Sequence, residues 1–261
     1  NEGNDYFGQT SLYLYDLEEG KAKKIMDGAI GRPSFNGNSI YYSKRSKYGN
    51  KYGSRFFDIY EFDFEKKIEI RKTQDFRAFN PIFCSKDSSL YYISTFDGTN
   101  NIFKVDLKTS KSEKITNFKN NEIVSDLNYN NDKDVLYFDL TNNHFRQIFT
   151  INLFDSSMVK LIDSDSFDHR QISTSKEFYV FSDDRSGIHN LYYVGENNQG
   201  YISNTFGGSF MPDINRNSEI VYSVFENGKF KIAIIDSIEI ADAPNVGYSP
   251  SYFQKNTNLK D

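Results

Sequence analysis

The chain has 261 residues and a formal net charge of −5 at pH 7, with both signs of charge interspersed. This mild charge argues against nucleic acid or an anionic membrane surface as a partner. The aromatic residues are 24 Phe and 19 Tyr without any Trp, a usage that favours β-strands. A single cysteine, Cys84, excludes an intrachain disulfide and a cysteine-rich metal site, and its apolar neighbours predict that it is buried.

The chain opens on Asn1 and contains no signal peptide, no apolar run of transmembrane length and no initiating Met. We therefore expect a fragment of a larger chain that does not itself insert into a membrane, with adjacent domains of the parent chain among its partners.

One strand pattern recurs six times. Each copy starts with a polar or small residue, continues with an aliphatic residue and usually an aromatic one, and ends near an acidic or small residue. The aliphatic anchors are Leu12, Ile59, Ile102, Ile148, Leu191 and Ile232, which lie 47, 43, 46, 43 and 41 residues apart. Self-similarity at such a period is typical of repeat folds.

Three further strands accompany the last five copies. A short run that is apolar on both faces precedes each copy, at 40–42, 90–93, 135–138, 178–181 and 220–222. An opening strand comes before that run, and a more polar strand closes most units. Four antiparallel strands per 41 to 47 residues, joined by turns rich in Gly, Asp and Asn, predict an all-β fold of β-propeller blades. A β-sandwich is the alternative, and no helix is predicted.

The repeat divides the chain as follows: an N-terminal half blade at 6–30, full blades at about 31–78, 79–122, 123–166 and 167–208, a last blade at 209–240 and a linker or tail at 241–261. Ser237-Ile238-Glu239-Ile240 is a candidate fourth strand of the last blade. The parent ring is expected to have six or more blades. The half blade leaves an uncovered edge at Leu12–Tyr15, so we expect the isolated chain to self-associate and to be less stable than its parent. Extension upstream by roughly half a repeat is expected to restore a monomer.

The second full unit carries a family resemblance. It reads Asn80-Pro81-Ile82-Phe83, then Ser85-Lys86-Asp87, Leu90-Tyr91-Tyr92-Ile93-Ser94, Asp97-Gly98 and Asn101-Ile102-Phe103-Lys104-Val105-Asp106. This sequence pattern resembles the repeat of the TolB-like propeller family, and weaker copies of it cover about residues 6 to 240. The resemblance implies a bacterial, periplasmic or cell-envelope protein that docks other envelope proteins. Similar repeats form the gating propellers of prolyl-oligopeptidase-type and tricorn-type proteases.

Catalytic and metal motifs are missing from the sequence. There is no G-x-S-x-G element, and His144, His169 and His189 are each predicted in loops, with solvated or structural roles. The acidic run 163–168 lacks the glycine and glutamate of a calcium loop, so we interpret it as an inter-blade turn. Asp183-Asp184 is likewise interpreted as a turn. We expect no enzyme activity, no cofactor and no metal.

The connection from Ser43 to Phe57 is unusually long and carries basic residues, two tyrosines and no acid. Long loops with charge and aromatics are frequent contact surfaces, although a solvated insertion is the alternative. The candidate partner-binding residues are Lys44, Arg45, Tyr48, Lys51, Tyr52 and Arg55. We expect this loop to share one face with the turns near Arg77, His169 and Phe210.

Two functions remain open at this point. The first is a non-catalytic protein-interaction or scaffolding propeller of a bacterial envelope protein. The second is the accessory or gating propeller of a serine protease whose catalytic domain lies elsewhere in the parent chain.

Overall fold

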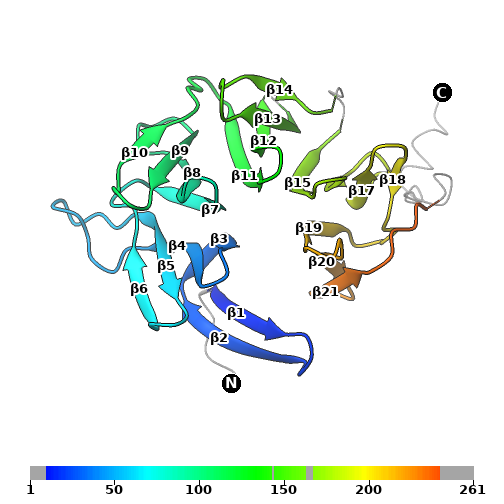
Figure 1. Ribbon diagram of the computed structural model, residues 1–261, viewed down its shortest axis with the longest axis horizontal. Coiled ribbons are helices and arrows are strands. Elements are labelled where there is room, and N and C mark those ends of the chain that lie inside the picture. Colours follow the sequence, from blue (N-terminus) through cyan, green and yellow to red (C-terminus); the bar gives the residue numbers. More distant parts are fainter. Residues whose placement is uncertain (1–9, 143, 163–166, 242–261) are drawn as a thin grey trace, which may run out of the picture. The chain divides into compact units, whose positions relative to one another are not determined.

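The computed structural model describes residues 10–142, 144–162 and 167–241. These residues form 21 β-strands and no helix (Figure 1). No helix in this part of the chain could therefore cross a membrane. The chain divides into two compact units, Asn1–Asn131 and Asp132–Asp261.

The first unit begins with a two-stranded sheet and continues with complete four-stranded sheets. The two-stranded sheet pairs β1 (Ser11–Asp16) with β2 (Lys21–Asp27). The next sheet contains β3 (Ala29–Phe35), β4 (Ser39–Arg45), β5 (Phe57–Asp63) and β6 (Ile68–Arg71). The one after it contains β7 (Ala78–Cys84), β8 (Ser89–Ser94), β9 (Asn101–Asp106) and β10 (Ser112–Lys114). The unit ends with β11 (Ile123–Asn130).

The second unit repeats the pattern. Following β11 in strand order are β12 (Val135–Asn142), β13 (Phe145–Asn152) and β14 (Met158–Lys160). A complete sheet contains β15 (His169–Thr174), β16 (Tyr179–Asp183), β17 (Asn190–Val194) and β18 (Gln199–Tyr201). The last sheet has three strands, β19 (Ser209–Ile214), β20 (Ile220–Glu226) and β21 (Lys229–Ile235). Neighbours in every sheet are consecutive in sequence, which confirms the predicted all-β repeat of antiparallel blades.

Each complete sheet holds an aromatic pair between its second and third strands. The second-strand members Tyr42, Tyr92, Phe138 and Phe181 are fully buried. Their cross-strand partners are Tyr60, Phe103, Phe149 and Tyr192, with ring centroids 6.2, 6.0, 5.9 and 5.6 Å apart. Such pairs contribute about 0.5–1.5 kcal/mol beyond the area that they bury. The aromatic residue that follows the aliphatic anchor in the sequence repeat therefore packs inside its sheet against the second strand.

The apolar strands pack between neighbouring sheets. In the first unit one cluster joins Tyr41 and Ile59 of the β3–β6 sheet to Ala78 and Leu90 of the β7–β10 sheet. A cluster in the second unit likewise packs Val180 and Leu191 against Ile220. These strands are apolar on both faces because each face meets another sheet.

A buried polar side chain closes three of the sheets, and the sequence analysis did not single it out. Asp58, Asn101 and Asn190 begin the third strand of their sheets and are almost completely buried. Each accepts a hydrogen bond from a hydroxyl beyond the fourth strand: Thr73 at 2.8 Å, Thr116 at 2.9 Å and Ser203 at 3.0 Å. The same hydroxyls accept the N–H of the aliphatic anchors Ile59, Ile102 and Leu191.

The acceptor also holds the start of the connection that follows the sheet. The Asp58 carboxylate accepts the N–H of Phe76 at 3.0 Å, and the Asn101 amide oxygen accepts the N–H of Phe118 at 2.7 Å. One buried side chain thus joins the third strand, the fourth strand and the outgoing connection. We call this arrangement the polar lock.

The first strands of the sheets are linked through residues in the left-handed region. Asn80 has φ 46° at a register shift in β7. Its side chain accepts the N–H of Arg32 at 3.1 Å and donates to the carbonyl of Ser125 at 2.7 Å. Glycine suits position 31, because its φ is 70° and a Cβ would lie 2.0 Å from the Asn80 side-chain oxygen, which would then have to move. In the second unit Gln171 plays the same part by accepting the N–H of Met211 at 3.0 Å.

The predicted fourth strand at Ser237–Ile240 is wrong. This segment is not a strand, and Ala241 donates its N–H to the carbonyl of Tyr201, at the end of β18. In the complete sheets four or five residues turn the chain between the third and fourth strands, whereas only Asp236 separates the end of β21 from Ser237. The chain has no room to turn back, so it continues to the neighbouring sheet.

The N-terminal sheet has an outer strand with exposed side chains. Tyr13, Leu14 and Tyr15 on β1 are all exposed, and β1 pairs only with β2 among the described strands. This is the edge expected at Leu12–Tyr15. The self-association expected from it stays a prediction.

Replacing Thr73 by Val should destabilise the fold by about 1–3 kcal/mol, because the buried Ile59 N–H and the Asp58 carboxylate each lose a partner. Thr73→Ser keeps the hydroxyl and is the matched control. Urea denaturation of both variants measures the effect. Equal stability of the two would show that the polar lock does not contribute.

Candidate functional site

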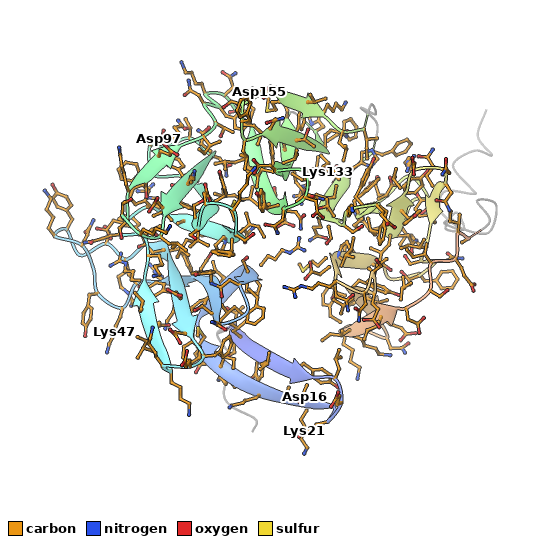
Figure 2. The ribbon with its side chains drawn as sticks, viewed as in Figure 1. Asp16, Lys21, Lys47, Asp97, Lys133 and Asp155 are labelled. Carbon is orange, nitrogen blue, oxygen red and sulfur yellow. The ribbon has the colours of Figure 1, made fainter. Side chains whose placement is uncertain are left out.

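The long connection between β4 and β5 projects from its sheet (Figure 1). We call residues 46–56 the tip loop; Lys47 lies on it (Figure 2). The loop is anchored at its base, where the N–H of Ser46 donates to the carbonyl of Phe56 at 2.8 Å. The ladder between β4 and β5 continues directly into this bond, so the loop is an extension of the hairpin.

The tip of the loop is a compact turn built on a short repeat. Lys47-Tyr48-Gly49-Asn50 is followed by Lys51-Tyr52-Gly53-Ser54. The Asn50 side chain accepts the N–H groups of Tyr52 and Ser54, and its main chain pairs with Ser54 and Gly53. A Cβ at Gly49 would lie 2.6 Å from the Gly53 carbonyl oxygen, so only glycine permits this crossing.

Two tyrosines of the tip loop are exposed. Tyr48 is 74% and Tyr52 78% exposed. The Nζ atoms of Lys47 and Lys51 lie 5.4 and 4.9 Å from the centres of these rings. An ammonium over an aromatic face is a favourable cation–π contact. The tip therefore presents two matched lysine–tyrosine pairs to solvent.

The other basic residues of the predicted site have structural contacts. Lys44 bonds the carboxylate of Glu69 at 2.7 and 3.0 Å. The guanidinium of Arg45 donates to the Arg55 carbonyl at 3.2 Å, and that of Arg55 donates to the Ser46 carbonyl at 2.7 Å. Both arginines clamp the base of the loop. The six predicted residues thus divide into a base of Lys44, Arg45 and Arg55 and a tip of Tyr48, Lys51 and Tyr52.

The base of the loop meets the turn at Arg77. The guanidinium carbon of Arg77 lies 4.8 Å from the centre of the Phe56 ring, and Phe57 packs on Phe79 with ring centroids 5.4 Å apart. This contact places the turn near Arg77 beside the loop. That the turns near His169 and Phe210 share this face stays a prediction.

A second cluster of polar groups lies at the end of β16 and includes His169, for which the predicted loop position is wrong, because His169 begins β15. Nδ1 of His169 is 2.9 Å from a carboxylate oxygen of Asp183, and both side chains are completely buried. Arg185 donates to both carboxylate oxygens, at 3.0 and 2.8 Å, and the Tyr201 hydroxyl donates at 2.7 Å. Burial alone raises the pKa of Asp183, but the contacts with His169, Tyr201 and Arg185 outweigh it and leave this pKa below its usual value.

The other two histidines and the cysteine lie outside this cluster. Burial, then the charge of Arg170, lowers the pKa of His189, whose ring packs on Phe210. His144 is exposed. Cys84 is buried as predicted, and burial raises the pKa of its thiol. No group of three His, Cys, Asp or Glu suited to a metal ion occurs among the described residues. Residues 163–166 of the acidic run lie outside them.

Comparison with known proteins identifies the fold. No protein-family model and no curated protein sequence matches the chain. Among solved structures, TolB from Acinetobacter baumannii is similar with a TM-score of 0.62 and 15% identity, over 85% of this chain and 61% of that one. A putative TolB from Agrobacterium tumefaciens has a TM-score of 0.72 and 9% identity, over 87% and 85%. The fold is a TolB-like β-propeller.

A third neighbour comes from a protease. The β-propeller domain of the Trilobed protease from Pyrococcus furiosus, described as having an open velcro topology, has a TM-score of 0.54 and 15% identity, over 80% of this chain and 81% of that one. The chain spans about three fifths of the Acinetobacter TolB. At these identities the likeness is one of fold.

The Asp183 cluster predicts a pH dependence. Because the folded-state pKa of Asp183 is lowered, its carboxylate stabilises the fold fully above the unfolded value of about 3.9, and this contribution is lost as the pH falls through the lower folded value. Asp183→Asn should cost about 2–3 kcal/mol at pH 7 and less below pH 3. Denaturation at several pH values, with the exposed Asp236→Asn as control, tests this. A pH-independent loss would contradict it.

Proposed function

We propose that this chain is a non-catalytic protein-interaction propeller of a bacterial envelope protein, and that the tip loop contacts an acidic partner. The observation that carries the proposal is the tip itself: two exposed tyrosines, each beside a lysine, on a turn ordered by Asn50. Exposed aromatic and basic groups on a rigid turn lose little entropy when they bind.

The structural contacts of the polar side chains support a non-catalytic role. His169 and Asp183 are both completely buried. Arg185 and Tyr201 also donate hydrogen bonds to the Asp183 carboxylate. The likeness to the two TolB structures supports an envelope setting, and the mild overall charge leaves the tip loop as a local basic feature.

A protease accessory propeller is the second candidate. Its support is the similarity to the propeller domain of the Trilobed protease. An α/β-hydrolase domain encoded in the parent reading frame would favour this candidate, and an outer-membrane or peptidoglycan-binding domain there would favour the first. Both predict that the purified chain has no peptidase activity.

Reversing the two tip charges tests the proposed surface. Lys47→Glu with Lys51→Glu should weaken binding of the partner captured from a bacterial envelope extract by roughly tenfold, because rim charges steer acidic partners. The melting temperature should not change, since neither lysine holds the base of the loop. The captured protein is identified, purified and titrated against each variant.

The matched control reverses two exposed lysines elsewhere, Lys108→Glu with Lys119→Glu, and changes the net charge equally. Equal weakening by both pairs would show that overall charge, and not the tip loop, determines binding. Unchanged capture by the tip variant would remove the tip loop as the site.

A further inference from the structure

Among the described strands, the last sheet has an unpaired edge where the four complete sheets have a fourth strand. β21 is the outer strand of the three-stranded sheet β19-β20-β21. In the complete sheets the third strand is covered on this side by a strand of three or four residues, such as β6 or β10. Residues 237–241 do not fill the position, because Ala241 bonds to Tyr201.

The register identifies the backbone groups at this edge. Ser43 is opposite Ile59 and Ser223 is opposite Ile232, so Ile232 takes the position of Ile59. The Ile59 carbonyl accepts the N–H of Lys72 at 2.8 Å, and the Ile102 carbonyl accepts that of Ile115 at 2.8 Å. Ile232, and by alternation Ile234, therefore direct N–H and C=O groups to the open edge.

One face of β21 is also apolar. Phe230 is 64%, Ile232 64% and Ile234 49% exposed, and they alternate along β21. Exposed apolar edge strands are sites where another strand can add. Lys229 and Lys231 alternate with them, and the ammonium of Lys231 pairs with the carboxylate of Glu226.

A tyrosine in the second strand specifies a side chain of the missing strand. The Tyr42 hydroxyl donates to Glu69 on β6, and the Tyr92 hydroxyl bonds Ser112 on β10 at 3.2 Å. Glu69 and Ser112 occupy the same register position, opposite Phe62 and Val105. In both sheets the tyrosine reaches across the third strand to a polar group on the fourth.

Tyr222 holds the same position in the last sheet. It lies opposite Ala233, as Tyr42 lies opposite Tyr60. The aromatic partner is replaced here by alanine, so less side chain separates the Tyr222 hydroxyl from the open edge. By register, the residue that it would meet is the one opposite Ile235.

We propose that β21 binds an extended segment of a partner protein, antiparallel to it, with a glutamate opposite Ile235 and aliphatic residues on either side. The chain itself supplies the pattern, since Ile68-Glu69-Ile70 fills this position in the β3–β6 sheet. The exposed edge strand β1 offers Leu12-Tyr13-Leu14 without such an acceptor, so β1 of a second copy is a poorer match.

The test uses the whole chain and a labelled synthetic peptide that copies residues 66–73 with its three lysines replaced by serine. Binding is measured by fluorescence anisotropy, and exchange of the Ile232 and Ile234 amides by NMR. We expect the peptide to bind and to protect both amides. Ile234→Pro removes one edge N–H and should abolish binding, whereas Ile234→Thr keeps that N–H and should bind.

The glutamate contact is tested by a double-mutant cycle. A peptide carrying Glu69→Ala should bind wild-type chain about tenfold more weakly than the parent peptide, because one charge-assisted hydrogen bond is lost. Tyr222→Phe should bind the two peptides equally. Equal loss in both proteins would overturn the role of Tyr222, and this comparison does not depend on the folding of the proline variant.

Three results would overturn the proposal as a whole. Protection of both amides in the free chain would mean that a second copy or residues after 241 already fill the edge. Absence of peptide-induced protection would mean that no strand adds there. Undiminished binding by Ile234→Pro, with the variant folded, would place the peptide elsewhere. The tip-loop variant Lys47→Glu with Lys51→Glu should bind the peptide normally, so failure of one proposal is distinguishable from failure of the other.

Discussion

The polar lock at Asp58, Asn101 and Asn190 is the interaction on which each of these sheets depends. The aliphatic anchors beside these residues are buried, and their N–H groups need partners inside the protein. A hydroxyl from beyond the fourth strand provides the partner, and the acceptor side chain orients that hydroxyl and holds the outgoing connection. Strand pairing, sheet closure and the step to the next sheet are therefore coupled at one buried site.

The last sheet departs from this rule at two positions. Lys231 stands where three of the complete sheets have the lock residue and the β11–β14 sheet has Gln147, and Ala233 stands where all four have an aromatic. Both changes fall on β21, the strand that lacks a fourth-strand neighbour. Among the described strands, the outer edge of β21 has no partner.

The sequence predicted the repeat well because its signal is local. Anchors such as Ile59 and Ile102 and the adjacent aromatic recur in a fixed order. The strand pattern can be recognised within a few residues of sequence. The lock was missed because its members are about 15 residues apart, and a polar residue at the start of a strand is indistinguishable from an exposed one. Ser237–Ile240 has the composition of a fourth strand, but the missing turn residues before it decide its path.

The candidate site was predicted only as a region. The composition of the loop grouped Lys44, Arg45 and Arg55 with the tip residues. The sequence does not reveal that Glu69, 25 residues away, neutralises Lys44. Nor does it reveal that backbone carbonyls accept hydrogen bonds from the two arginines. The tip is the turn held by Asn50. Its repeated Lys-Tyr-Gly sequence was the one feature of the sequence that distinguished the tip from the base. The exposed tip of the loop thus presents two lysine–tyrosine pairs.

Site-specific photo-crosslinking tests the central claim most directly. A photoreactive amino acid is placed at Tyr48 or Tyr52, or at the almost fully exposed Phe154 as a control, and irradiated in a bacterial envelope preparation. The account predicts that both tip positions crosslink one and the same protein and that Phe154 does not. Crosslinking of that protein from Phe154 as readily as from the tip, or from neither tip position, would contradict an interaction propeller that binds through its tip loop.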